Sequence, residues 1–595
     1  MGTTTVHSSG GASLRAIVVR GVRRRGYRRV GGLLIGLLVL LTACGPQAAP
    51  SQSSGGQTAP AGAAPKKTVT IAIQREPTAF AEFGGAQSPV AGGASNVKNI
   101  VHDSLSIETA VEAYEAQLAE ELPSLEKGTW RVNPDGTMQT TWKLRPNIKW
   151  HDGTPFTTDD VRFAFELTKD PDLARSRGSG FEYLDSLTIQ DAQTFVVNWK
   201  TTFGEAYRQE VGTFVPRHLL EEAYRADKEA FTNSRLLSTQ FVGLGPYKLT
   251  RWEQGSFIEF TRFDDYYRAR PLLDSVIVRI VGDPNAMVAN VLAGEVDVVL
   301  PVGVDVEAAL EVKRRWEGTG NQVQADPTGR LRQLELQFRP EYARPRNGLP
   351  VRAVREALYR AIDRQSMVEV LTQGLAPVAD SWIPPNHGLR NDLAASIPQY
   401  PYDPARAQQL LAQAGWAKGA DGVLVHQPDG ERFDIEIWAN QGFGAEKEVG
   451  VVADNWKAVG VAAAPFFVPA ARAGDREFEA THPGPFITNP SGNAFYDDRL
   501  HSKAVTGPEN RWSGRNRAGY TNPKVDAILD RLVIAINPSE RVDLHRQLLQ
   551  EGMGDVVLMP TFWEVVPILA LKGITGPKVV RNEATANFYL WDKRA

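Results

Sequence analysis

The sequence predicts an α/β protein that folds as more than one lobe. Its 595 residues are several times the usual domain length of about 100–200 residues, so two or three lobes are expected. Strand-like segments alternate with capped, amphipathic helical segments along most of the chain. A hydrophobic fraction of 42%, with 24 Phe, 15 Tyr and 13 Trp, is typical of a globular protein with an ample core.

The first strand is expected at residues 68–73, TVTIAI, because β-branched residues dominate there. Residues 136–150 read as strand and turn, and a helix is expected directly after them. Thr157 can cap that helix, and Asp160 follows three residues later, as in a capping box. Acidic residues in the first helical turn also favour the positive end of the helix dipole.

Further strands and helices complete a first α/β lobe. Residues 242–263 predict a Gly-Pro turn followed by a long hairpin about residues 254–256. Residues 284–300, PNAMVANVLAGEVDVVL, predict a helix that stops at Gly294 and then a strand.

A second α/β block follows. Residues 351–363 place apolar side chains on one helical stripe, and residues 403–416 predict a helix capped by Asp403 and ended at Gly415. Residues 422–438 suggest a hairpin about Pro428-Asp429-Gly430, followed by a helix that Gly460 closes. The tail predicts two capped helices and then a strand-like stretch that crosses back to the first lobe.

The N-terminus reads as a bacterial export signal. Seven arginines between residues 15 and 29 precede the apolar run VGGLLIGLLVLL, which is too short to span about 30 Å of hydrocarbon comfortably. The run ends in Leu41-Thr42-Ala43-Cys44, which resembles the lipobox of bacterial lipoproteins, so residues 1–44 are expected to be a lipoprotein signal peptide with Cys44 as the lipidation site. The alternative is an ordinary cleaved signal with an incidental Cys. Residues 45–67 lack large apolar side chains and predict a flexible tether.

Charge and motifs exclude several classes of function. The chain has 66 basic and 69 acidic residues and a formal charge of −3, which offers no footprint for nucleic acid. It contains no HExxH, GxSxG, Walker-type or CxxC motif, and its nine histidines are scattered. We therefore expect no catalytic residues, no metal site and no cofactor. The adjacent His151 and Asp152 could be half of a triad or a metal site, but nothing nearby completes either, and a structural role is favoured.

Several segments, taken in order, resemble one family. They are WKLRPNIKWHDGTPFTTDDV, VPRHLL, GLGPYKL, FDDYYRARPLLDSVIVRI, LAGEVDVV, VRAVREALYRAIDRQSMVEVLTQG and YDPARAQQLLAQAGW. The chain is similar to the extracytoplasmic solute-binding proteins of ABC importers that include the oligopeptide-, dipeptide- and nickel-binding receptors, solute-binding protein family 5. The blocks extend through most of the chain after the tether.

The resemblance implies a two-lobe periplasmic-binding-protein clamp of the class II type, with an extra domain inserted in the first lobe. The expected boundaries are residues 68–105, 243–328 and 562–595 for lobe I, 106–242 for the inserted domain and 329–561 for lobe II. The two crossings between the lobes, near 326–332 and 560–565, are expected to form the hinge.

One departure from the family concerns the ligand. Peptide-binding members place an Asp in the second lobe to pair with the free amino group of the ligand, whereas no acid lies between Glu479 and Asp497 here. A buried ammonium without a carboxylate costs several kcal/mol. Either the ligand lacks a free amine, or Asp497 or Asp498 takes that place. A nickel ligand has weaker support, because His482 stands alone.

Six residues are candidates for contact with the ligand. In FDIEIWANQG, period-two alternation places Trp438 and Asn440 on one side near the end of a strand. The Pro/Gly-rich loop PGPFITNPSGNAFY offers four more, which are Phe486, Asn489, Asn493 and Tyr496. The alternative is that Trp438 belongs to the core and that the loop aromatics pack against the lobe beneath them.

The resulting hypothesis is a membrane-tethered, monomeric receptor that captures an extracellular solute between two lobes and delivers it to an ABC importer. The expected partners are a small solute or peptide, the importer's permease subunits and, through the lipid anchor, a membrane. The expected location is the outer face of the cytoplasmic membrane or the periplasm. A sensor or scaffold lipoprotein with the same clamp is the second class of function, and a hydrolase is the third.

Overall fold

The computed structural model describes residues 66–81, 93–173, 180–208, 211–440, 444–472, 474–489, 497–580 and 583–594. The predicted signal peptide, Cys44 and the tether up to residue 65 lie outside these residues, as do Asn493 and Tyr496. None of the helices in the described part of the chain is long and apolar enough to cross a membrane.

Most strands of the described residues join one mixed sheet. In spatial order its ten strands are β16 (Ala462–Val468), β15 (Asp434–Asn440), β17 (Phe486–Thr488), β12 (Gln322–Glu335), β18 (Leu558–Ala570), β11 (Val298–Val299), β1 (Thr68–Ile73), β10 (Ser275–Ile280), β9 (Phe257–Arg262) and β8 (Tyr247–Glu253). Strand β1 has the predicted bounds, and β8 and β9 form the predicted hairpin.

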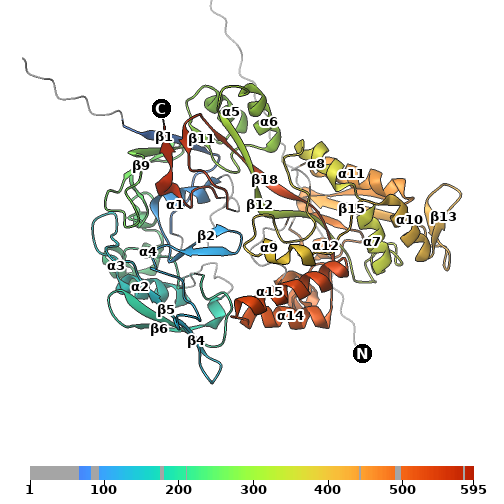
Figure 1. Cartoon of the computed structure of the whole chain (residues 1–595), viewed down its shortest axis with the longest axis horizontal. Coiled ribbons are helices and arrows are strands. Elements are labelled where there is room, and N and C mark those ends of the chain that lie inside the picture. Colours follow the sequence, from blue (N-terminus) through green and yellow to red (C-terminus); the bar gives the residue numbers. More distant parts are fainter. Residues whose placement is uncertain are drawn as a thin grey trace, which may run out of the picture. The chain divides into compact units, whose positions relative to one another are not determined.

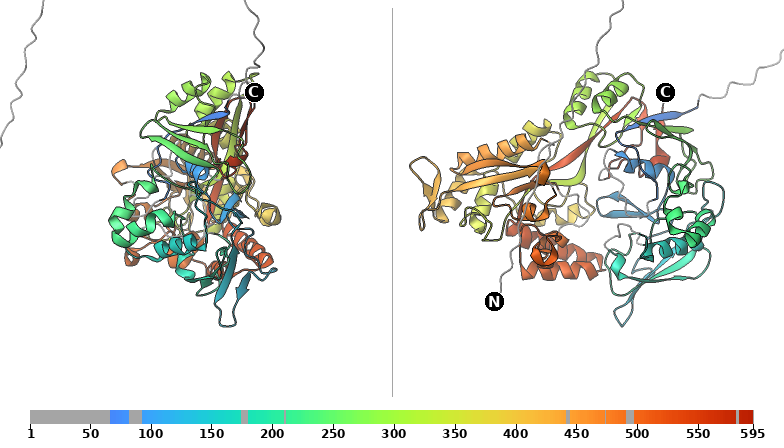
Figure 2. Two further views of the ribbon diagram at one scale, coloured as in Figure 1. Left: turned by 90° about the vertical axis from the view of Figure 1, so that its left-hand side faces the viewer. Right: turned by 180° about the vertical axis from the view of Figure 1, so that it is seen from behind.

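Two long strands, β12 and β18, lie side by side in the middle of this sheet, as Figure 1 and the views of Figure 2 show. They are antiparallel and pair from Gln322 opposite Ala570 to Glu335 opposite Leu558, with a register shift between Pro327 and Leu331. Both predicted crossings between lobes fall within these strands. The lobe boundaries given above stay a prediction.

The segment between β1 and β8 contains a second, smaller sheet. Its order is β4 (Trp130–Val132), β5 (Met138–Lys143), β7 (Thr194–Trp199) and β6 (Leu184–Ile189). Helix α2 (Thr158–Lys169) begins with the predicted capping box, in which the Thr157 hydroxyl accepts from the N–H of Asp159 and the Asp160 carboxylate accepts from the N–H of Thr157. The apolar core of this segment contains Val161 and Ala164 of α2 and Trp142 of β5.

His151 connects two of the sequence blocks. Its Nδ1 accepts a hydrogen bond from the N–H of Gly243 at 3.2 Å, so its Nε2 donates to the carbonyl oxygen of Gly245 at 2.9 Å. Both glycines press on the backbone of Val101, where an added Cβ would lie 2.0 Å and 2.4 Å from its atoms. Asp152 accepts from Thr154 and lies 2.6 Å from His218. These contacts give His151 a structural role.

A hairpin of β2 (Ser106–Ala110) and β3 (Ala113–Ala116) reaches a distant part of the chain. Val111 at its turn is fully buried in the large hydrophobic core that also holds Leu334 and Ile437 of the main sheet. The N–H of Val111 donates to the carbonyl oxygen of Asn386, and its own carbonyl oxygen accepts from the N–H of Gly388. The hairpin therefore ties residues near 110 to residues near 387.

The remaining helices fall into two sets, one before β12 in the chain and one after it. Before β12 these are α1 (Ser95–Val101), α3 (Arg217–Ala226), α4 (Lys228–Thr232), α5 (Pro284–Leu292) and α6 (Val306–Arg315). After β12 they are α7 (Arg352–Arg360), α8 (Arg364–Thr372), α9 (Arg390–Leu393), α10 (Pro404–Gln413), α11 (Ala445–Ala458), α12 (Arg476–Ala480), α13 (Asp497–Leu500), α14 (Pro523–Ile534) and α15 (Pro538–Leu548). Two short pairs remain, β13 (Trp416–Lys418) with β14 (Leu424–His426) and β19 (Ile574–Thr575) with β20 (Asp592–Lys593). Strand β14 pairs with β13. The chain also turns back at the predicted turn about residues 428–430, where the N–H of His426 donates to the carbonyl oxygen of Glu431 and a single bridge joins Val425 to Arg432.

Candidate ligand-binding site

The order of the parallel strands reverses at β15. Strand β15 is followed through α11 by β16 on one side, and β17 then returns to pair on its other side. In open α/β sheets, ligands bind outside the carboxyl ends of the strands at such a switch point. Asn440 ends β15 in an exposed position, and Asn489 directly follows the last residue of β17. Two of the predicted site residues therefore lie at the point where this topology favours a ligand.

Two of the predicted aromatic residues, Trp438 and Phe486, lie together in a small cluster on one face of the sheet. Trp438 stands opposite Phe486 on β17 and Phe466 on β16, and the ring of Phe478 lies 4.9 Å from that of Trp438. The Trp438 indole donates to the Glu436 carboxylate at 2.9 Å. Trp438 is 5% exposed and Phe486 is 2% exposed, so both present little surface in this structure.

Asn489 belongs to a network of charged side chains. Its amide donates to Oε1 of Glu564 at 3.0 Å. Glu564 also lies 3.2 Å from Nε of Arg330 and 3.5 Å from Nη1 of Arg332, and Arg332 is paired with Glu448 in the first turn of α11. The network thus joins β12, β18, α11 and the end of β17.

Burial controls the electrostatics of this network. Burial raises the pKa of the Glu448 carboxyl, and the nearby Arg332 guanidinium offsets part of that rise. Burial alone would lower the pKa of Arg332, but Glu448 and Glu564 hold it above its usual value. Side-chain exposure is 2% for Glu448 and 9% for Arg332, but 25% for Glu564 and 33% for Arg330. The latter two are therefore the members that a solute can reach.

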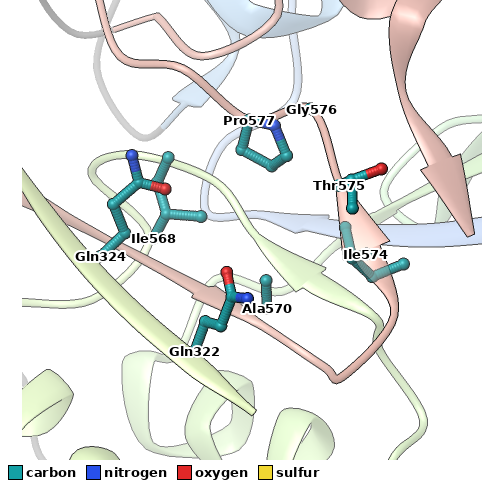
Figure 3. A pocket seen from close by; sticks show the side chains of 8 residues that line it. All are labelled: Gln322, Gln324, Ile568, Ala570, Ile574, Thr575, Gly576 and Pro577. Carbon is teal, nitrogen blue, oxygen red and sulfur yellow. The ribbon is translucent and has the colours of Figure 1, made fainter. Parts of the chain in front are cut away.

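A cavity of about 250 Å³ lies at the other end of the β12–β18 pair (Figure 3). It is lined by Gln322, Gln324, Ile568, Ala570, Ile574, Thr575, Gly576 and Pro577. Gln322 stands opposite Ala570 and Gln324 opposite Ile568 on the paired strands, while Pro577 closes the space from the returning C-terminal segment. Apolar walls with two amide groups make this cavity suitable for part of a small organic ligand.

The histidine considered for a nickel ligand is enclosed by protein. His482 is buried, its Nδ1 donates to the carbonyl oxygen of Gly484, and burial lowers its pKa to about 4. Among the described residues, no group of three or more His, Cys, Asp or Glu could hold a metal ion.

Residues 116–507 match the family described as bacterial extracellular solute-binding proteins, family 5 Middle. The chain belongs to this family. The oligopeptide-binding protein AppA of Bacillus subtilis is 26% identical over 445 residues, which cover 74% of this chain and 76% of AppA. The glutathione-binding protein GsiB of Escherichia coli O157:H7 is 26% identical over 457 residues, which cover 75% of this chain and 80% of GsiB.

Solved structures of family 5 proteins show the same fold. The oligopeptide-binding protein of Thermus thermophilus, complexed with a pentapeptide, has a TM-score of 0.61 at 22% identity and covers 88% of this chain and 96% of its own. NikA of Brucella suis, in complex with Fe(III)-EDTA, has a TM-score of 0.69 at 19% identity and covers 89% of this chain and 100% of its own. The two-lobe clamp expected from the sequence is therefore confirmed, as is membership of an extracellular binding-protein family.

Sequence reasoning missed the charged members of this candidate site. Arg330, Arg332, Glu448 and Glu564 come from segments more than a hundred residues apart, and their pairing depends on the register of β12 with β18. One signal was available, since Glu564 is the lone charged residue in the apolar run VVLMPTFWEVVPILAL. A charge inside a buried strand usually has a partner or a function.

Proposed function

We propose that this family 5 protein captures a peptide or peptide-like solute between its lobes and delivers it to an ABC importer. The observation that supports this most directly is the convergence of Asn440, Asn489 and the Glu564 network at the switch point of the second lobe, beside the strands that cross between the lobes. The solute-binding relatives and the peptide complex of the T. thermophilus protein support a peptide-like ligand.

The tether is part of the same proposal. Cys44 would carry the lipid, and stable attachment needs more than one acyl chain because a single chain binds a membrane only marginally. Residues 45–67 would then allow a monomeric receptor to turn at the membrane surface and meet the permease subunits.

The test begins with the mature protein purified from its own cells and analysed by mass spectrometry for bound small molecules. We expect a peptide-like compound to be recovered unchanged and to raise the unfolding temperature when it is added back. Uptake of that compound in cells with and without the protein separates transport from sensing, and chemical change of the compound would support the hydrolase alternative instead.

A further inference from the structure

One face of the β12–β18 pair carries several partly exposed side chains, although Ile568 and Ala570 on it are buried. In β18, Glu564 and Val566 are half-buried, whereas Trp563 and Val565, which point to the opposite face, are buried. Val566 stands opposite Asp326 of β12, and the next pairs on the same face are Gln324 with Ile568 and Gln322 with Ala570. The cavity and Glu564 therefore lie on one continuous face.

The cavity end of this face is apolar and carries two amide groups. Gln322 is exposed, and its side chain makes no hydrogen bond to any described residue. Gln324 donates to the carboxylate of Asp326, which leaves its amide oxygen as an acceptor. Ile568, Ala570, Ile574 and Pro577 complete the walls. This end suits a small apolar group that carries an amide.

The other end presents a guanidinium group. Nε of Arg330 is buried against Glu564, while the side chain as a whole, which ends in two terminal nitrogens, is 33% exposed. Within the described ranges those terminal nitrogens have no hydrogen-bond partner. The backbone N–H of Arg330 donates to the Thr328 hydroxyl at 2.9 Å, which fixes the chain at this point.

The charges within the network balance, because Arg330 and Arg332 face Glu448 and Glu564. The case for an anion therefore rests on the hydrogen-bond donors that Arg330 keeps for a ligand, since Glu564 lies 3.2 Å from its Nε. A guanidinium fork matches a carboxylate with two parallel hydrogen bonds. In addition, residues 480–496 contain no acid that could pair with a ligand amine.

The length of the face limits the ligand. Ile568 lies four positions after Glu564 in β18, which at about 3.3 Å per residue is about 13 Å. An extended tetrapeptide has about the same length.

We propose that the site takes an elongated, carboxylate-ended solute, with the carboxylate on Arg330 and the opposite end in the cavity lined by Gln322 and Gln324. This inference rests on the proposed function and adds the chemistry of the ligand. Asp326, between the two ends, then accepts hydrogen bonds from N–H groups of the solute.

The experiment uses the full mature chain, freed of co-purified solute, and two probes that differ only in charge. N-acetyl-tetraalanine has a free carboxylate, and its C-terminal amide does not. By titration calorimetry we expect the acid to bind about ten- to a hundredfold more tightly than the amide, as for a hydrogen-bonded charge. Arg330→Gln should abolish this difference, and Arg330→Lys should restore part of it. Arg314→Gln, an exposed position on α6, is the matched control.

The cavity is tested separately. Gln322→Trp should fill its open side and weaken binding of the tetrapeptide acid about tenfold or more, whereas Gln322→Ala should change it little. The proposal is overturned if the wild-type protein binds acid and amide equally, if it does not bind the acid at millimolar concentration, or if Arg330→Gln keeps the preference. If one of these results is obtained and a bound native solute is still recovered, only this inference fails and the proposed function stands. If no bound solute is recovered either, the result counts against this inference and against the proposed function.

Discussion

The buried pair of Arg332 and Glu448 provides the sharpest stability prediction. Glu448→Gln keeps the size of the side chain and removes its charge. Arg332 is then left with Glu564, whose Oε1 lies 3.5 Å away, as its nearest carboxylate. Removing one partner of a buried pair costs about 3–5 kcal/mol. Because Glu564 compensates part of this, we expect the free energy of unfolding to fall by about 2–3 kcal/mol.

Urea unfolding followed by tryptophan fluorescence measures this loss as a lower midpoint at unchanged slope. Glu446→Gln, an exposed acid in the same helical turn, is the control and should stay within about 0.5 kcal/mol of the wild type. The double variant Arg332→Met/Glu448→Leu should recover most of the loss, because a well-packed apolar pair can replace a buried ion pair. Wild-type stability in Glu448→Gln, or a double variant weaker than Glu448→Gln, would refute the reasoning.

Three further predictions concern individual side chains. Burial lowers the pKa of His151 to about 4 from 6.5, so its contribution to stability is full above about pH 6.5 and is lost at lower pH, where the unfolded chain takes up a proton that the native state does not. Between neutral pH and about pH 4, the free energy of unfolding of His151→Gln in urea titrations should therefore fall by about 3 kcal/mol less than that of the wild type, with ligand affinity within a few fold. An unchanged acid profile would contradict this. Trp438→Ala should stay folded and lose about 1–4 kcal/mol of binding to the co-purified ligand by calorimetry; full affinity, or loss of the fold instead, would assign Trp438 to packing alone. Cys44→Ser should release the protein from the membrane fraction, and complete retention there would disprove lipid attachment at this residue.

Local patterns predicted the elements well. Asp403 caps α10 through the N–H of Arg406, Pro404 opens the helix, and Gly415 has the left-handed φ of +87° expected at its end. The capping box of α2 and the bounds of β1 were equally readable. In each case the signal lies within a few residues of the feature that it specifies, so no knowledge of tertiary structure was needed.

The site was less predictable because it depends on contacts between distant segments. Alternation placed Trp438 on one face of β15, but it could not show that Phe478 of α12 covers that face. Asn489 was selected as a loop residue. Its contact with Glu564 depends on where β17 ends and on how β17 and β18 pair with β12, which the sequence does not show. The turn predicted at residues 428–430 does form, but the sequence did not show that β14, which precedes it, pairs with β13.

The position of β18 between β11 and β12 has a consequence for how the chain folds. Strand β18 comes from residues 558–570, yet its neighbours end at residues 299 and 335. Until the last tenth of the polypeptide arrives, both neighbours have unpaired edges, which are prone to pair with other chains. Such long sequence separation also gives a high contact order and slow folding. An exported chain of this topology therefore gains from being kept unfolded until translocation is complete, since only then can the middle of its sheet close.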